Sequence, residues 1–163
     1  MTPLENKVSP RKIAEQKYKS ARNNLLLMIG FTVINIVLLV LDAGVMFLFS
    51  ATIPYYATLF GMMVDSAAAM TVLFLVAAFS IIAYLVCWIF SKKHFGWMIG
   101  ALVLFVIDTV AMGWIALMAL DISAIIDVAF HAWVIVYLVV GISNGSKLRT
   151  LPEESEQEVI EDL

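Results

Sequence analysis

The sequence predicts an all-α integral membrane protein whose four transmembrane helices form an up-down bundle. The first observation is composition: the 163 residues are 63% hydrophobic and 14% charged, with a mean hydropathy of +0.97. Soluble domains contain only about 45 to 50% apolar residues. The second is that the apolar residues form long runs between short polar segments, and about 20 such residues are enough to cross a hydrocarbon core.

The positions of the basic residues predict the topology. Six Lys and Arg residues precede the first apolar run, Lys92 and Lys93 lie in the central gap, and Lys147 and Arg149 follow the last run. Cytoplasmic loops retain Lys and Arg, whereas translocated loops lack them. We therefore expect a multi-pass protein of a cytoplasmic membrane, of the bacterial inner-membrane kind, with both termini in the cytoplasm.

The segment 1–23 is predicted to be a basic, amphipathic juxtamembrane segment. A Ser-Pro pair at residues 9 and 10 is typical of a helix start, and small or aromatic residues then recur on one face among basic neighbours. That stripe consists of Ala14, Tyr18, Ala21 and Leu25. Attraction to anionic lipid explains such a helix along the inner leaflet, and docking to a protein is the alternative.

The first span is predicted at about 24–48, and the aromatic, nearly uncharged stretch after it is unlike a solvated loop. Pro54, followed by Tyr55 and Tyr56, favours a short helix near 53–64 in the outer interface, where Tyr is common. A re-entrant segment is the alternative, and its backbone would have to be buried in protein or line a water-filled cavity.

The other three spans are predicted at about 67–90, 96–118 and 123–141. Small residues four apart in the third span, Gly96 with Gly100 and Thr109 with Gly113, indicate close helix approach and suggest that this span is the central packing helix.

The sequence after the last span predicts a cytoplasmic tail. The SNGS stretch that follows Gly141 is typical of a loop. The rest of 142–163 is acidic and has few core-forming residues, which predicts a disordered segment.

Polar residues at matched depth predict a layer inside the membrane domain. Asp108 lies about 15 to 18 Å from the inner start of its span, close to the midplane, and His131 lies about 12 Å below the outer surface on the next span. Asn35 and Ser80 come out at similar depths on the other two spans. Ionisable residues are costly at this depth, so we expect one buried site in which Asp108 and His131 meet.

Four further acids gather in the outer half, where the sequence has no Lys or Arg. Asp127 shares the face of His131, and Asp42, Asp65 and Asp121 are predicted to form an acidic entrance that concentrates cations. The alternatives are that Asp65 and Asp121 cap helices and that Asp42 and Asp127 are simply hydrated. An Asp108 to His131 hydrogen bond could equally serve to hold two helices together.

Two functions remain open from the sequence. The first is binding or conduction of a cation or proton from the outer face, and oxygen ligands with an imidazole would also suit a divalent metal. The second is an accessory or scaffold subunit that does not transport and acts through a partner. The chain contains no recognised catalytic motif, so we expect no enzyme and no cofactor, and we expect no nucleic acid partner. A homo-oligomer or a larger membrane partner is expected because four spans bury few side chains.

Overall fold

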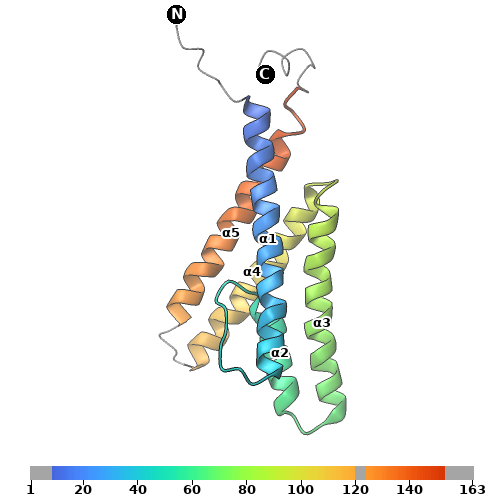
Figure 1. The fold of residues 1–163 in the computed structure, drawn as a ribbon, viewed down its shortest axis with the longest axis vertical. Coiled ribbons are helices and arrows are strands. Elements are labelled where there is room, and N and C mark those ends of the chain that lie inside the picture. The colour runs from blue at the N-terminus through green and yellow to red at the C-terminus, as the bar shows by residue number, and fades with distance from the viewer. Residues whose placement is uncertain (1–8, 120–123, 153–163) are drawn as a thin grey trace, which may run out of the picture.

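A computed structural model describes residues 9–119 and 124–152, and these form five helices (Figure 1). The helices are α1 (Pro10–Val40), α2 (Thr52–Met63), α3 (Ala67–Phe90), α4 (Gly96–Ala119) and α5 (Ala124–Lys147). All except α2 are long and apolar enough to cross a membrane. The predicted class, an all-α multi-pass membrane bundle, is confirmed.

The two ends of the bundle differ in charge. The turn between α3 and α4 carries Lys92 and Lys93 and lies on the same side as the start of α1 and the end of α5 (Figure 1). We call this side the basic end. Asp42, after α1, and Asp65, between α2 and α3, lie at the opposite side, which we call the acidic end.

The predicted juxtamembrane segment is part of the bundle rather than a separate helix. It continues without a break into the first span, and α1 packs more extensively against α5 than any other two elements pack together. Ala14, Ala21 and Leu25 are buried, as the stripe predicts. The stripe therefore faces the interior of the bundle, where Ala21 meets Gly141 of α5.

Two glycines of α5 allow this close packing. A Cβ atom at Gly141 would lie 2.6 Å from the Cβ of Ala21, and one at Gly145 would lie 2.8 Å from the ring of Tyr18. Gly145 also lies in a helix that continues to Lys147, so the loop predicted after residue 141 is wrong. The residues from 153 onward in the predicted tail lie outside the described part of the chain.

Of the glycines predicted to pack closely on α4, only Gly100 does so. A Cβ atom at Gly96 or Gly113 would meet nothing within 4 Å, and one at Gly100 would lie 3.3 Å from Cys87 Sγ. Close helix approach at a glycine thus occurs where α4 meets α3 at Gly100, and also where α2 meets α3, since a Cβ atom at Gly61 would lie 2.7 Å from the Phe74 ring.

The first span ends at Val40, eight residues before the predicted boundary at 48. The chain reverses through two left-handed residues, Asp42 with φ of 52° and Gly44 with φ of 62°. The Ala43 amide donates to the Leu38 carbonyl at 3.0 Å, and the Asp42 amide donates to the Leu39 carbonyl at 3.1 Å. These two bonds form a Schellman cap, which satisfies the last carbonyls of the helix.

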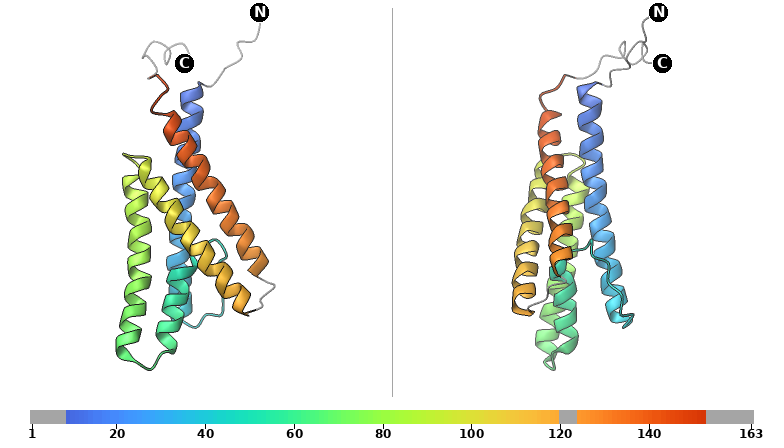
Figure 2. Two further views of the ribbon diagram at one scale, coloured as in Figure 1. Left: turned by 180° about the vertical axis from the view of Figure 1, so that it is seen from behind. Right: turned by 90° about the vertical axis from the view of Figure 1, so that its left-hand side faces the viewer.

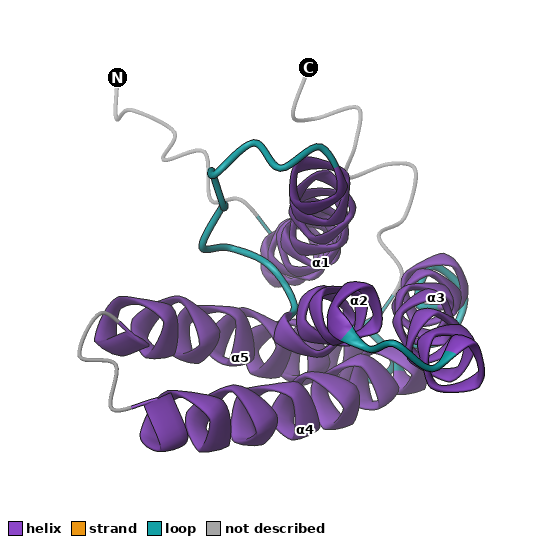
Figure 3. Ribbon diagram, turned by 90° about the horizontal axis from the view of Figure 1, so that it is seen from below, coloured by secondary structure: helices purple, strands orange, loops and turns teal. Residues whose placement is uncertain are grey.

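The segment that follows α1 returns into the bundle, and α2 then leads back to the acidic end (Figure 1). Seen along the bundle, α2 lies between α1, α3 and the α4 and α5 pair, and it packs most extensively on α3 (Figure 3). Its first turn contacts Asp108, which we placed near the membrane midplane. The helix near 53–64 therefore exists, and its first turn lies inside the bundle beside Asp108.

The apolar core fills the space between Asp108 and the basic end. Its largest fully buried side chains include Leu25 and Met28 from α1, Met98 and Phe105 from α4, and Leu138 from α5. Because each of these lies nearer to the basic end of its helix than the predicted polar layer, the site described below is closed on that side.

Candidate functional site

Asp108 supplies the N-terminal cap of helix α2. Its side chain is almost fully buried, and its two oxygens accept hydrogen bonds from the backbone amides of Thr52, at 2.8 Å, and Ile53, at 2.7 Å. The first amides of a helix lack intrahelical partners, and the α2 N-cap residue, Ala51, offers no side-chain bond. The positive end of the α2 dipole also favours a carboxylate here.

His131 lies beside this cap on α5 and is almost fully buried. Its Nδ1 lies 2.9 Å from the backbone carbonyl of Asp127. Because a carbonyl only accepts hydrogen bonds, Nδ1 carries a hydrogen and donates it. The second ring nitrogen, Nε2, lies 3.2 Å from Thr52 Oγ1 and 3.3 Å from Asp108 Oδ2. The imidazole also stacks on Phe105, with the ring centres 5.0 Å apart.

Two polar side chains of α1 hold the extended segment that leads into α2. Asn35 is fully buried; its Nδ2 donates to the Phe47 carbonyl at 2.7 Å, and its Oδ1 accepts from the Phe47 amide at 2.7 Å. Thr32 Oγ1 accepts from the Ala51 amide at 2.8 Å. Backbone groups inside a membrane need such partners, because no helix or sheet satisfies them in this segment.

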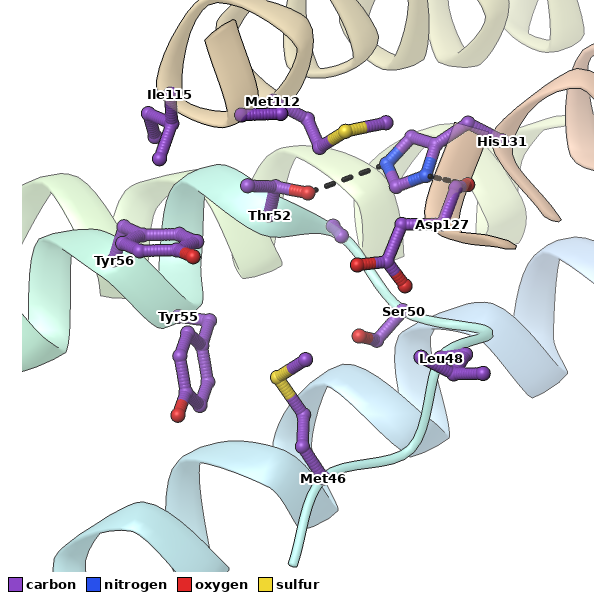
Figure 4. A pocket seen from close by; sticks show the side chains of 12 residues that line it. Met46, Leu48, Ser50, Thr52, Tyr55, Tyr56, Met112, Ile115, Asp127 and His131 are labelled. Carbon is purple, nitrogen blue, oxygen red and sulfur yellow. Dashed lines mark hydrogen bonds between the residues drawn. The ribbon is translucent and has the colours of Figure 1, made fainter. Parts of the chain in front are cut away.

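A small pocket lies beside His131, between the extended segment before α2, the first turns of α2, and α4 and α5. It has a volume of about 60 Å³ and is lined by twelve residues, among them Tyr55, Tyr56, Thr52, Asp127 and His131. Figure 4 shows the Thr52 hydroxyl directed at the imidazole and the Asp127 side chain extending toward Ser50. The space is enough for a few water molecules and is much smaller than the pockets that bind drug-sized ligands.

The structure brings together most residues predicted for the buried site, but not all. Asp108 and His131 are in contact, Asp127 holds His131 and lines the pocket, and Asn35 fixes the adjoining segment. Ser80 does not join them, because its hydroxyl donates to the Val76 carbonyl of its own helix at 2.8 Å. Ser80 lies at a depth similar to that of Asp108, but similar depth did not predict contact. The partners of Asp108 come from α2 rather than from α3.

The predicted acidic entrance is not assembled at the pocket. Asp42 and Asp65 are exposed residues of the acidic end, and neither lines the pocket that reaches His131. Asp121 lies outside the described residues.

The side chains of the site do not fit a divalent metal ion. Within residues 9–119 and 124–152, no three His, Cys, Asp or Glu side chains converge on one point. Each oxygen of Asp108 already accepts a backbone amide, and Oδ2 also faces His131 Nε2.

Sequence reasoning missed the contribution of α2. Thr52 supplies both an amide and a hydroxyl to the site, yet it lies in a segment that was expected at the membrane surface. One signal was available: Pro54 sits in the first turn of α2, and Pro is favoured there because its missing amide needs no partner. A helix that starts at residue 52 has unpaired amides, which makes a buried acid the natural partner.

Comparison with known proteins gives no match to a family model, a curated protein or a solved structure. Function is therefore inferred from the residues of the site.

Proposed function

We propose that this protein binds a proton from the outer face of a bacterial cytoplasmic membrane, at the Asp108 and His131 pair. In this proposal both termini are cytoplasmic, and the acidic end faces outward, as the positions of Lys and Arg predict. The observation that carries the proposal is the pocket lined by His131, whose Nε2 lies 3.3 Å from a buried carboxylate.

The hydrogen-bond geometry leaves a place for one proton between the two side chains. Nδ1 already donates to the Asp127 carbonyl, so Nε2 of a neutral imidazole has a lone pair, which lies 3.2 Å from the Thr52 hydroxyl and 3.3 Å from Asp108 Oδ2. Two acceptors at 3.3 Å attract each other only when a hydrogen lies between them. One shared proton makes the pair electrically neutral, whether it resides on the imidazole or on the carboxyl group.

The surroundings support a protonated pair. The Phe105 ring stacks on the imidazole at 5.0 Å and offers its π-face to a cation. Without the proton, a carboxylate charge would be buried with only the α2 amides and the helix dipole to balance it. We propose binding rather than conduction, because packed apolar side chains separate the site from the basic end.

Proton binding would act on residues 41–53, which lead from α1 into the first turn of α2. Asp108 holds the first turn of α2, and Thr52 contacts both members of the pair. Loss of the proton at high outer pH removes the hydrogen bond between Asp108 and His131 and leaves a buried charge. The contacts that fix residues 41–53 then become weaker. The protein would then respond to outer pH through the position of this segment.

Hydrogen exchange tests this proposal. In lipid nanodiscs, amides of residues 41–53 should exchange faster as pH rises, after correction for the intrinsic pH dependence of exchange. His131→Gln should remove this extra dependence, and His94→Gln, which changes an exposed histidine at the basic end, should keep it. The same profile in all three proteins would refute the proposal. Ion flux in proteoliposomes that Asp108→Asn abolishes would instead favour conduction.

A second candidate function is that of an accessory subunit without transport activity. It is favoured by the structural use of the polar layer, in which Asp108, Asn35 and Thr32 all bond to backbone atoms of one segment. A protein partner or a second copy would cover part of the apolar helix surface. Pull-down from native membranes with and without residues 151–163 tests it, because an unchanged set of partners argues against recruitment through the tail.

A further inference from the structure

A second pocket, of about 480 Å³, lies at the basic end, where the α3 to α4 turn meets α1 and α5. Lys92, Lys93 and His94 from the turn line it together with Arg149, which follows α5. Tyr18 of α1 also contributes to the wall. Every side chain of the lining that is charged at neutral pH is a cation, so the pocket has the electrostatics of an anion site.

These cations are available to a ligand. In the described part of the chain, Lys92, Lys93 and Arg149 form no ion pair. The Arg149 guanidinium lies 5.6 Å from the centre of the Phe95 ring. Arg11 differs, because it bonds to Glu15 at 3.2 Å.

The wall of the pocket is preformed. The Tyr18 hydroxyl donates to the Ser91 carbonyl, which ties α1 to the end of α3. Gly145 packs so closely on the Tyr18 ring and on Phe95 that an added Cβ atom would lie within 2.8 Å of both. Tight packing behind the cations fixes the positions of the turn and of α5, which lowers the cost of ordering the site on binding.

The pocket also lies at the level where lipid phosphates are expected. The turn that contains it joins two membrane-spanning helices, and Trp97 and Phe90 stack beside it with ring centres 5.1 Å apart. Aromatic residues of this kind are enriched at membrane interfaces. Figure 2 shows that α1 and α5 extend past the turn between α3 and α4.

We propose that this pocket binds the phosphate group of an anion, supplied by the headgroup of an anionic phospholipid. Basic pockets between helices at the membrane surface have the charge and position that such headgroups require. The Lys92 and Lys93 ammonium groups and the Arg149 guanidinium would contact the phosphate, and the acyl chains would extend along the apolar helix surface. The site shares no residue with the Asp108 and His131 pair, so either proposal can fail without the other.

Lipid titration of the whole protein in neutral detergent tests the proposal, with thermal stability as the readout. The probes are dioleoylphosphatidylglycerol, dioleoylphosphatidylcholine and inorganic phosphate. The variant Lys92→Gln/Lys93→Gln removes two pocket charges, and Lys19→Gln/Lys147→Gln removes two exposed charges outside it. Lys92 and Lys93 would contact the phosphate, at about 1 kcal/mol each, so the pocket variant should need at least about tenfold more phosphatidylglycerol. Lys19 and Lys147 do not line the pocket, so the control should need less than about threefold more.

The results assign the source of the phosphate. A response to phosphatidylglycerol that inorganic phosphate does not reproduce supports the lipid headgroup, and an equal response to inorganic phosphate supports a soluble phosphate in the same pocket. An equal loss in both double variants, or equal responses to the anionic and the zwitterionic lipid, would overturn the proposal. Arg149→Gln gives an independent check, because it should weaken phosphatidylglycerol binding while both lysines remain.

Discussion

Replacing Asp108 with Asn tests the role of this carboxyl group most simply, because the substitution keeps the shape and removes one acceptor. Asp108 Oδ1 and Oδ2 each accept a backbone amide of α2. An Asn side chain has only one oxygen, so in either orientation its NH₂ group faces the amide of Thr52 or of Ile53. One buried amide therefore loses its partner, and the partial positive charge of the helix start loses its counter-charge.

The size of the effect follows from that lost bond. A buried donor without a partner costs about 1 to 3 kcal/mol, and bonds to charged groups lie in the upper part of that range, so we expect a loss of about 2 to 3 kcal/mol. For a domain of this length, each kcal/mol lowers the melting temperature by about 2 to 4 °C. Asp108→Asn should thus melt about 4 to 12 °C below the wild type.

Thermal unfolding in detergent, followed by circular dichroism, measures this difference. Asp42→Asn is the matched control, because it makes the same chemical change at an exposed residue of the acidic end, and Asn tolerates the left-handed φ of 52° found there. We expect a shift for the control below about 0.5 kcal/mol. Equal melting temperatures for the two variants would refute the role of Asp108 as the cap of α2.

Three further predictions concern packing and single hydrogen bonds. Gly141→Ala should lower the free energy of unfolding by about 1 to 3 kcal/mol, because its Cβ atom would lie 2.6 Å from a side chain of α1. Gly113→Ala, where a Cβ atom meets nothing within 4 Å, should leave stability unchanged. Equal unfolding curves for both variants would contradict the close contact between α1 and α5. Arg22→Gln removes the hydrogen bonds to Ser91 Oγ, at 2.9 Å, and to the Trp88 carbonyl, at 3.1 Å. We expect it to lower the free energy of unfolding in detergent by about 1 to 3 kcal/mol. An unchanged melting temperature would show that these bonds contribute little. Thr52→Val should lower the free energy of unfolding by about 1 kcal/mol in the same assay, because it removes the hydroxyl contact with His131. The pH dependence of hydrogen exchange should remain, because the backbone amide of residue 52 still bonds to Asp108. A loss of that dependence would assign the proton to the hydroxyl contact instead.

The sequence predicted the parts of the fold that polar turns delimit. The spans expected at 67–90 and 96–118 correspond to Ala67–Phe90 and Gly96–Ala119, because Ser66 caps the former and the basic turn separates the two. Counting 1.5 Å per residue from such fixed ends was also enough to bring Asp108 and His131 to the same depth.

The parts that were wrong depend on contacts between distant residues. The chain leaves α1 at Val40 because Asn35 and Thr32 offer hydrogen bonds to a returning segment, which no local pattern reveals. The SNGS stretch is helical because Gly145 is packed between helices and Asn144 bonds to a carbonyl within α5, so packing overrides its weak helix propensity.

Nuclear magnetic resonance of His131 would test the central claim most directly. In a His94→Gln background His131 is the sole histidine, so its ring signals can be followed in proteoliposomes without ambiguity. We expect the imidazole to change protonation state when the pH outside is varied while the pH inside is held constant, with the acidic end outward. A signal that follows the inner pH, or that follows neither, would contradict a proton site reached from the outer face.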